Sequence, residues 1–141
     1  MRFWDSSALL PLFADEASRN GLLQRLDEDS EVLFWWSTPL EIAAALARRE
    51  RDGLLTGDQV SATLTAVRTL AAGWHEILPS DAVRRSAERL LRTHPLRTAE
   101  SLQLAAALVA ADHDPATLTV VSVDERLNAA ARREGFVVLG A

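Results

Sequence analysis

The 141-residue sequence contains no cysteine, no lysine and no tyrosine. The missing cysteines exclude disulfides, zinc–thiolate sites, iron–sulfur clusters and cysteine nucleophiles, and their absence fits a protein of the reducing cytoplasm. The missing lysines exclude Schiff-base chemistry and a Walker A phosphate site. All 15 basic residues are therefore arginines, and with 20 acidic residues the net charge is −5. That balance argues against a surface that is basic throughout and coats nucleic acid.

Long hydrophobic runs are also missing. The longest, residues 104–111, is far shorter than the roughly 20 residues that a membrane-spanning helix needs. At the start of the chain, Asp5 follows only two apolar residues after Arg2, so no secretory signal sequence is recognisable. We therefore expect a cytoplasmic protein with no membrane partner.

Hydrophobic residues make up 48% of the chain, and the 11 prolines and glycines form no linker. This composition predicts one domain covering residues 1–141. Short apolar segments alternate with amphipathic ones, which is typical of an α/β fold with a parallel sheet. The expected strands are residues 1–4, 31–36, 75–78, 118–123 and 136–139. The expected helices are residues 8–14, 16–26, 38 to about 53, 58–72, 81–91, 97–111 and 124–134.

Acidic residues stand where an α/β fold places its functional groups, at the carboxyl ends of the strands. Asp5 follows the first strand and Asp124 follows the strand at 118–123, while Glu41 and Glu100 lie in the first turns of two helices. Carboxylates that converge without a cation repel each other. Mg²⁺ or Mn²⁺ removes that repulsion, because both ions prefer oxygen ligands. The pattern therefore predicts a metal site for phosphodiester chemistry.

Local structural roles are open for the same acids. Thr38 and Glu41 have the spacing of a capping box. Asp124 stands before a helix as a typical N-cap residue, and Ser122 and Glu125 could form an overlapping box.

The remaining two acids differ in this respect. Ser6 or Ser7 could cap the first helix, which would leave Asp5 without a capping role. Glu100 lies on an otherwise apolar helix and has Arg97 one turn earlier as an ordinary ion-pair partner.

Four segments of the chain together resemble the motif regions of PIN-domain nucleases, and their order is similar to that in VapC-type toxins. They read FWDSSALLPLF, TPLEIAAALAR, LRTAESLQLAAAL and VSVDERLNAAARREGF. The resemblance implies a three-layer α/β/α sandwich around a mostly parallel sheet. It also implies Mg²⁺- or Mn²⁺-dependent endoribonuclease activity, a small cognate antitoxin that inhibits it, and a homodimer.

The resemblance also implies roles for single residues. Asp5, Glu41 and Asp124 match family acids, whereas Glu100 stands where the family usually has Asp. We expect Asp5, Glu100 and Asp124 to hold the metal, and Glu41 to orient or deprotonate the attacking water. Two hydroxyl residues would support the site, namely Ser6 and Ser122. Because Glu is one methylene longer than Asp, a catalytically silent PIN-like module that only binds proteins remains the alternative.

The arginines and the acidic residues suggest where RNA and an inhibitor would bind. Basic residues near the acids are candidate phosphate contacts, unless they are paired with acids on solvated helices. They are Arg48, Arg49, Arg51 and Arg97. Trp35 and Trp36 alternate in a strand, so one should face the core while the other could stack on a base. The acidic pocket itself would accept an Arg or Lys from an antitoxin, and no role is assigned to the histidines.

Overall fold

The sheet consists of five parallel strands in the order β3-β2-β1-β4-β5. The computed structural model describes residues 1–141. The strands are β1 (Arg2–Trp4), β2 (Val32–Trp35), β3 (His75–Ile77), β4 (Thr119–Val121) and β5 (Val137–Leu139). The chain adds β2 and β3 on one side of β1 and then returns to add β4 and β5 on the other. Ligands of α/β proteins bind beside such a reversal of strand order, so the carboxyl end of β1 is the place to look.

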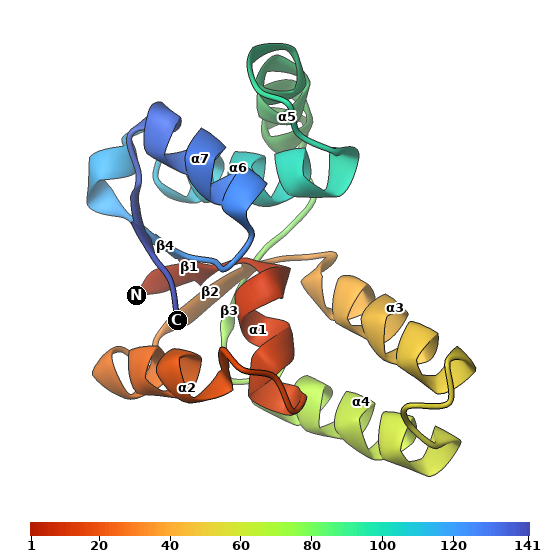
Figure 1. Ribbon diagram of the computed structural model, residues 1–141. Coiled ribbons are helices and arrows are strands. Elements are labelled where there is room, and N and C mark those ends of the chain that lie inside the picture. Colours follow the sequence, from red (N-terminus) through yellow and green to blue (C-terminus); the bar gives the residue numbers. More distant parts are fainter.

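Seven α-helices cover the two faces of the sheet (Figure 1). One face carries α1 (Ser6–Phe13), α2 (Arg19–Glu28), α3 (Thr38–Arg51) and α4 (Gly57–Ala71). The other carries α5 (Asp81–Thr93), α6 (Thr98–Ala110) and α7 (Glu125–Glu134). A short 3₁₀ turn at Pro115–Thr117 precedes β4. The expected three-layer α/β/α sandwich with a parallel sheet is confirmed.

The alternation of side chains along β1 builds a separate core on each face. Phe3 packs with α5, α6 and α7, whereas Trp4 packs with the four helices of the opposite layer. Successive side chains of a strand point to opposite faces, so the two aromatic neighbours anchor both layers to the central strand. Both are buried, and their burial fixes the position of the residue that follows them, Asp5.

Two helix starts differ by more than one residue from those expected. The first helix begins at Ser6 rather than residue 8, because Asp5 is its N-cap. The second begins at Arg19 rather than residue 16, because the chain turns before it.

The tryptophans of the second strand behave as expected, since Trp35 is buried and Trp36 is 52% exposed. None of the helices combines the length and the apolar character required to cross a membrane.

Candidate active site

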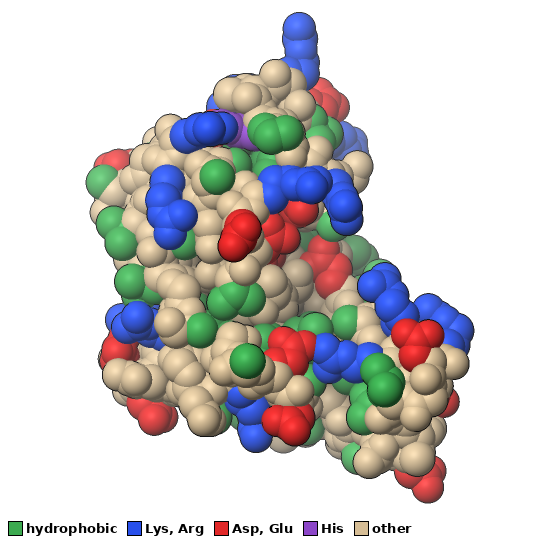
Figure 2. Space-filling model, in the orientation of Figure 1, with side chains coloured by type: hydrophobic (Ala, Val, Ile, Leu, Met, Phe, Trp, Pro, Cys, Tyr) green, Lys and Arg blue, Asp and Glu red, His purple; other side chains and the backbone are tan.

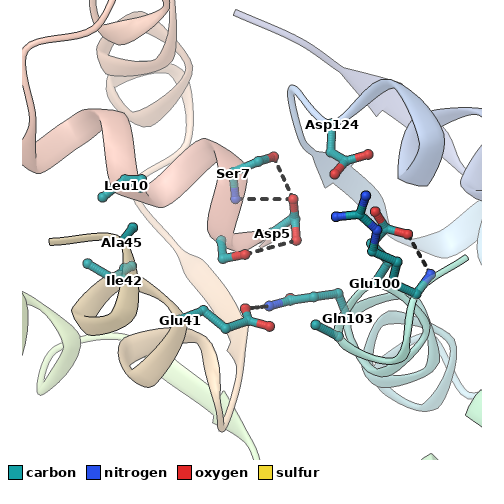
Figure 3. Close-up of a pocket in the computed structure, with 12 residues that line it drawn as sticks. Asp5, Ser7, Leu10, Glu41, Ile42, Ala45, Glu100, Gln103 and Asp124 are labelled. Atoms are coloured by element: carbon teal, nitrogen blue, oxygen red, sulfur yellow. Dashed lines mark hydrogen bonds between the residues drawn. The ribbon is translucent and has the colours of Figure 1, made fainter. Parts of the chain in front are cut away.

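The four acidic residues that the sequence singled out line one pocket of about 280 Å³. Two of them, Asp5 and Asp124, come from the ends of β1 and β4, and Glu41 and Glu100 come from α3 and α6. Figure 2 shows a hollow between the two helical layers with acidic side chains inside it. Figure 3 shows the same acids around the space, together with Ser7 and Gln103. The pocket thus brings together residues from both layers.

Asp5 is the most constrained of these acids. Its backbone N–H donates to the carbonyl of Val121 at 3.0 Å, which extends the β1–β4 pairing by one residue. Its Oδ2 accepts from the N–H of Ser7 at 3.1 Å, from the hydroxyl of Ser7 at 2.5 Å and from the hydroxyl of Ser122 at 3.3 Å. Asp5 therefore caps α1 itself, and the expectation that Ser6 or Ser7 would do so is wrong.

The other oxygen of Asp5 is much less satisfied. Only the hydroxyl of Ser6 approaches Oδ1, at 3.5 Å, and no arginine forms an ion pair with the carboxylate. Burial raises the pKa of Asp5, the charge of Asp124 raises it further, and hydrogen bonds from Ser7 and Ser122 oppose the rise. The fold therefore holds a buried acid whose free oxygen has no cationic partner, which is the environment that a hard metal ion relieves.

Asp124 and Ser122 connect β4 to α7. Asp124 is the N-cap of α7, and its Oδ1 accepts from the N–H of Leu127 at 2.9 Å. The hydroxyl of Ser122 accepts from the N–H of Asp124 at 3.2 Å while it donates to Asp5. The overlapping box of Ser122 and Glu125 does not form, because Asp124 occupies the capping position. Since capping uses one oxygen, Oδ2 of Asp124 stays available to the pocket.

Glu41 is held by a residue from the opposite layer. Its Oε2 accepts from Nε2 of Gln103 at 2.6 Å, and the same nitrogen donates to Oγ1 of Thr38 at 2.9 Å. The capping box of Thr38 and Glu41 is therefore wrong; α3 begins after Ser37 without a side-chain cap. Burial raises the pKa of Glu41, the nearby hydroxyl of Ser6 and the hydrogen bond from Gln103 oppose the rise, and the charge of Asp5 adds to it.

Glu100 faces its own helix. Its Oε2 accepts from the backbone N–H of Arg97 at 2.7 Å, and the guanidinium of Arg126 lies 4.0 Å away. Arg97 is thus the partner of Glu100, as expected, but its backbone N–H rather than its guanidinium makes the contact. With Glu100 in this position, no three acidic or histidine side chains lie close enough together to hold one ion. A metal site formed by Asp5, Asp124 and Glu100 therefore requires at least one of these side chains to move.

Comparison with known proteins identifies the fold. VapC20 from Mycobacterium tuberculosis superposes with a TM-score of 0.70 at 18% identity, covering 97% of each chain. FitAcB from Neisseria gonorrhoeae superposes with a TM-score of 0.70 at 16% identity, covering 99% of this chain and 96% of that one. The chain has the PIN-domain fold. A toxin–antitoxin complex from Klebsiella pneumoniae also matches, with a TM-score of 0.65, 14% identity and coverage of 88% and 87%. Neither a protein-family model nor a curated protein matches the sequence.

Only some of the arginines that the sequence suggested as phosphate contacts lie near the acids of this PIN-domain fold. Arg97 lines the pocket, and with Arg126 it also lines a shallow depression beside it. Arg49 forms an ion pair with Glu16, so it behaves as a structural residue. Neither Arg48 nor Arg51 lines this pocket, and no histidine does.

Two polar residues of the pocket were not identified as site residues from the sequence. Ser7 was considered only as a cap, yet its hydroxyl joins Asp5 to the N–H of Val123 at 3.1 Å. Gln103 received no role, although it is a polar residue within the apolar stretch LQLAAAL. Like Glu100, Gln103 is a polar residue on an apolar helix and needs a partner, and this signal was present in the sequence.

Proposed function

We propose that this protein is a metal-dependent endoribonuclease and the toxin of a type II toxin–antitoxin pair. The observation that carries the proposal is the buried Asp5 carboxylate, which has no basic partner and shares its pocket with Asp124 and Glu41. The fold likeness supports it, because VapC20 is described as a toxin that cleaves the sarcin–ricin loop.

The donors of the pocket suit a hard cation. Oδ1 of Asp5 and Oδ2 of Asp124 accept at most a long hydrogen bond from the protein, and both are oxygens, the ligand type that Mg²⁺ and Mn²⁺ prefer. In the proposal, Glu100 exchanges its contact with Arg97 for the metal, and Ser6 and Ser122 keep Asp5 in place. A bound ion would stabilise charge on the phosphate and lower the pKa of a water.

Glu41 has a different role in the proposal. It lies across the pocket on α3, and Gln103 holds one of its oxygens by a hydrogen bond of 2.6 Å. Its other oxygen is free to orient a water or to accept a proton from it. Such a base contributes about 10²–10⁴-fold to a rate.

The partners of the protein follow from the charges around the pocket. Arg97 and Arg126 at its rim are suited to phosphate groups of RNA. An arginine or lysine of an antitoxin would enter the acidic pocket, and one of the similar structures is a toxin–antitoxin complex. A homodimer and a cytoplasmic location complete the proposal.

The test is cleavage of cellular RNA by the purified protein in Mn²⁺ or Mg²⁺, with EDTA in a parallel reaction. We expect internal cleavage that EDTA stops and that added Mn²⁺ restores. Cleavage that continues in excess EDTA would contradict the role of the metal. The control is Glu88→Gln, which removes an exposed acid on α5, outside the pocket of the four acids, and should cleave at the wild-type rate.

A second function is favoured by one contact. Because Glu100 caps its own helix, the PIN-like module could lack a metal and only bind protein partners. Calorimetry separates the two functions, since a silent module shows no saturable uptake of Mn²⁺.

A further inference from the structure

Gln103 is a buried amide whose hydrogen bonds reach out of its own helix. It is 1% exposed on α6, and Nε2 uses its two hydrogens on Thr38 and Glu41 of α3. Both acceptors belong to the opposite layer, so this nitrogen is a polar link across the pocket between the two halves of the fold. Thr38, itself fully buried, fixes the amide from one side, and Glu41 receives the remaining hydrogen.

The carbonyl of the same amide has no partner. Oε1 of Gln103 is buried and accepts no hydrogen bond. A buried acceptor without a donor destabilises a protein, whereas an apolar side chain of similar size would avoid that cost. The stability of α6 therefore does not account for Gln103. What the amide provides is a donor directed at Glu41.

We propose that Gln103 is a positioning residue that holds the carboxylate of Glu41 in the orientation needed to bind the attacking water. This role rests on the proposed function, and it assigns to the site a residue that touches neither metal nor RNA. With Oε2 fixed by Gln103, the other oxygen of Glu41 is left for the water. Without the donor, the Glu41 side chain samples other rotamers. The orientation that binds the water is then only a minority of its conformers.

The contact itself is tested first, in metal-free protein labelled with ¹⁵N. The side-chain amide resonances of Gln103 should lie downfield, because one hydrogen is bonded to a carboxylate. Glu41→Gln should move them, and Glu100→Gln, the matched change elsewhere in the pocket, should leave them in place. Resonances that ignore Glu41→Gln would overturn the proposal, whether or not the protein cleaves RNA.

The role is then tested in steady-state cleavage of RNA with Mn²⁺. Gln103→Leu and Gln103→Met, whose side chain has a similar length, both remove the donor, and each should lower kcat about 10- to 100-fold. The KM for RNA and the Kd for Mn²⁺ should change less than about twofold, since neither ligand is touched. The control Ser101→Ala removes a buried hydroxyl of the same helix that bonds only to Thr98, and should keep the wild-type kcat.

The outcomes separate the two proposals. Wild-type kcat in both Gln103 variants would overturn the positioning role and leave the nuclease intact. Loss of Mn²⁺ affinity in both variants would also overturn it, because Gln103 would then act on the metal. A wild-type protein that cleaves no RNA would refute the proposed function, and the positioning role with it, while the resonances still show whether the contact exists.

Discussion

Asp5 and Glu100 line the same pocket, yet the fold holds them in opposite ways. The side chain of Asp5 is buried and receives three hydrogen bonds on one oxygen from Ser7 and Ser122. The side chain of Glu100 is held by a single backbone N–H at the start of its own helix. The first position is set by the centre of the sheet, whereas the second depends on one contact that a local rotation breaks.

The difference shows which part of the site is preorganised. The fold holds Asp5 in place by its own hydrogen bonds, and burial raises the pKa of this acid. Glu100 also lines the pocket, but its carboxylate is bonded to the backbone at the start of α6. We infer that Asp5 sets where an ion binds and that Glu100 sets how tightly. The following four changes test this comparison.

The largest effect is expected from Asp5→Asn. Asn still accepts the capping hydrogen bond of α1, so the fold should persist, while the charge that attracts the ion is lost. RNA cleavage in Mn²⁺ should fall on the order of 10³-fold or more. Circular dichroism of the variant should match the wild type. A variant that cleaves at the wild-type rate would remove Asp5 from the mechanism.

A smaller effect is expected from Glu41→Gln. The amide keeps the size of the side chain but cannot accept a proton, so kcat should fall about 10²-fold. Calorimetry should give a Kd for Mn²⁺ close to that of the wild type, because Glu41 is not assigned to the metal. If Mn²⁺ affinity falls together with kcat, Glu41 belongs to the metal ligands.

Glu100→Gln should have a still smaller effect. Gln at the third position of a helix still accepts the backbone N–H of Arg97, so this change removes the charge and keeps the cap. Mn²⁺ affinity should fall about tenfold, and the melting temperature should stay within about 1–2 °C. Unchanged affinity would mean that Glu100 is only a helix cap, which favours the silent module.

The smallest effect concerns stability. Burial raises the pKa of Asp5 above its unfolded value, so the metal-free folded state binds the proton more tightly. The contribution of Asp5 to stability is then most favourable at low pH and is lost as the pH rises through the raised pKa. In EDTA at neutral pH, Asp5→Asn should therefore unfold at a higher temperature than the wild type, because the substitution removes a buried charge. Thermal melts from pH 3 to 8 check this; a difference that does not narrow toward acid pH would contradict it.

The sequence predicted the architecture well, because the apolar segments and the amphipathic helices between them are both visible in short stretches of the chain. The apolar segments 1–4, 31–36 and 118–123 contain the three central strands, and their alternation with helices indicated a parallel sheet. The positions of Asp5 and Asp124 after two of these strands then followed from the rule for strand ends. Residues that owe their place to a strand could thus be found without coordinates.

The details of hydrogen bonding could not be predicted in the same way. The spacing of Thr38 and Glu41 fits a capping box, but Gln103, more than 60 residues later, binds both side chains instead. Asp5 and Ser7 have equal propensity to cap a helix, and only the continued pairing of Asp5 with Val121 decides between them. Partners that are distant in sequence leave no spacing pattern, which is why Gln103 was missed.

The pairing of Asp5 with Val121 also has a consequence for motion. An amide bonded within the central strands of a sheet is released only when the whole domain opens, whereas the first turn of a helix frays far more often. In deuterium exchange, the amide of Asp5 should be among the slowest in the chain, and the amide of Arg97, bonded to Glu100, among the faster ones. The carboxylate of Asp5 would then keep its position at the end of β1 for as long as the protein stays folded.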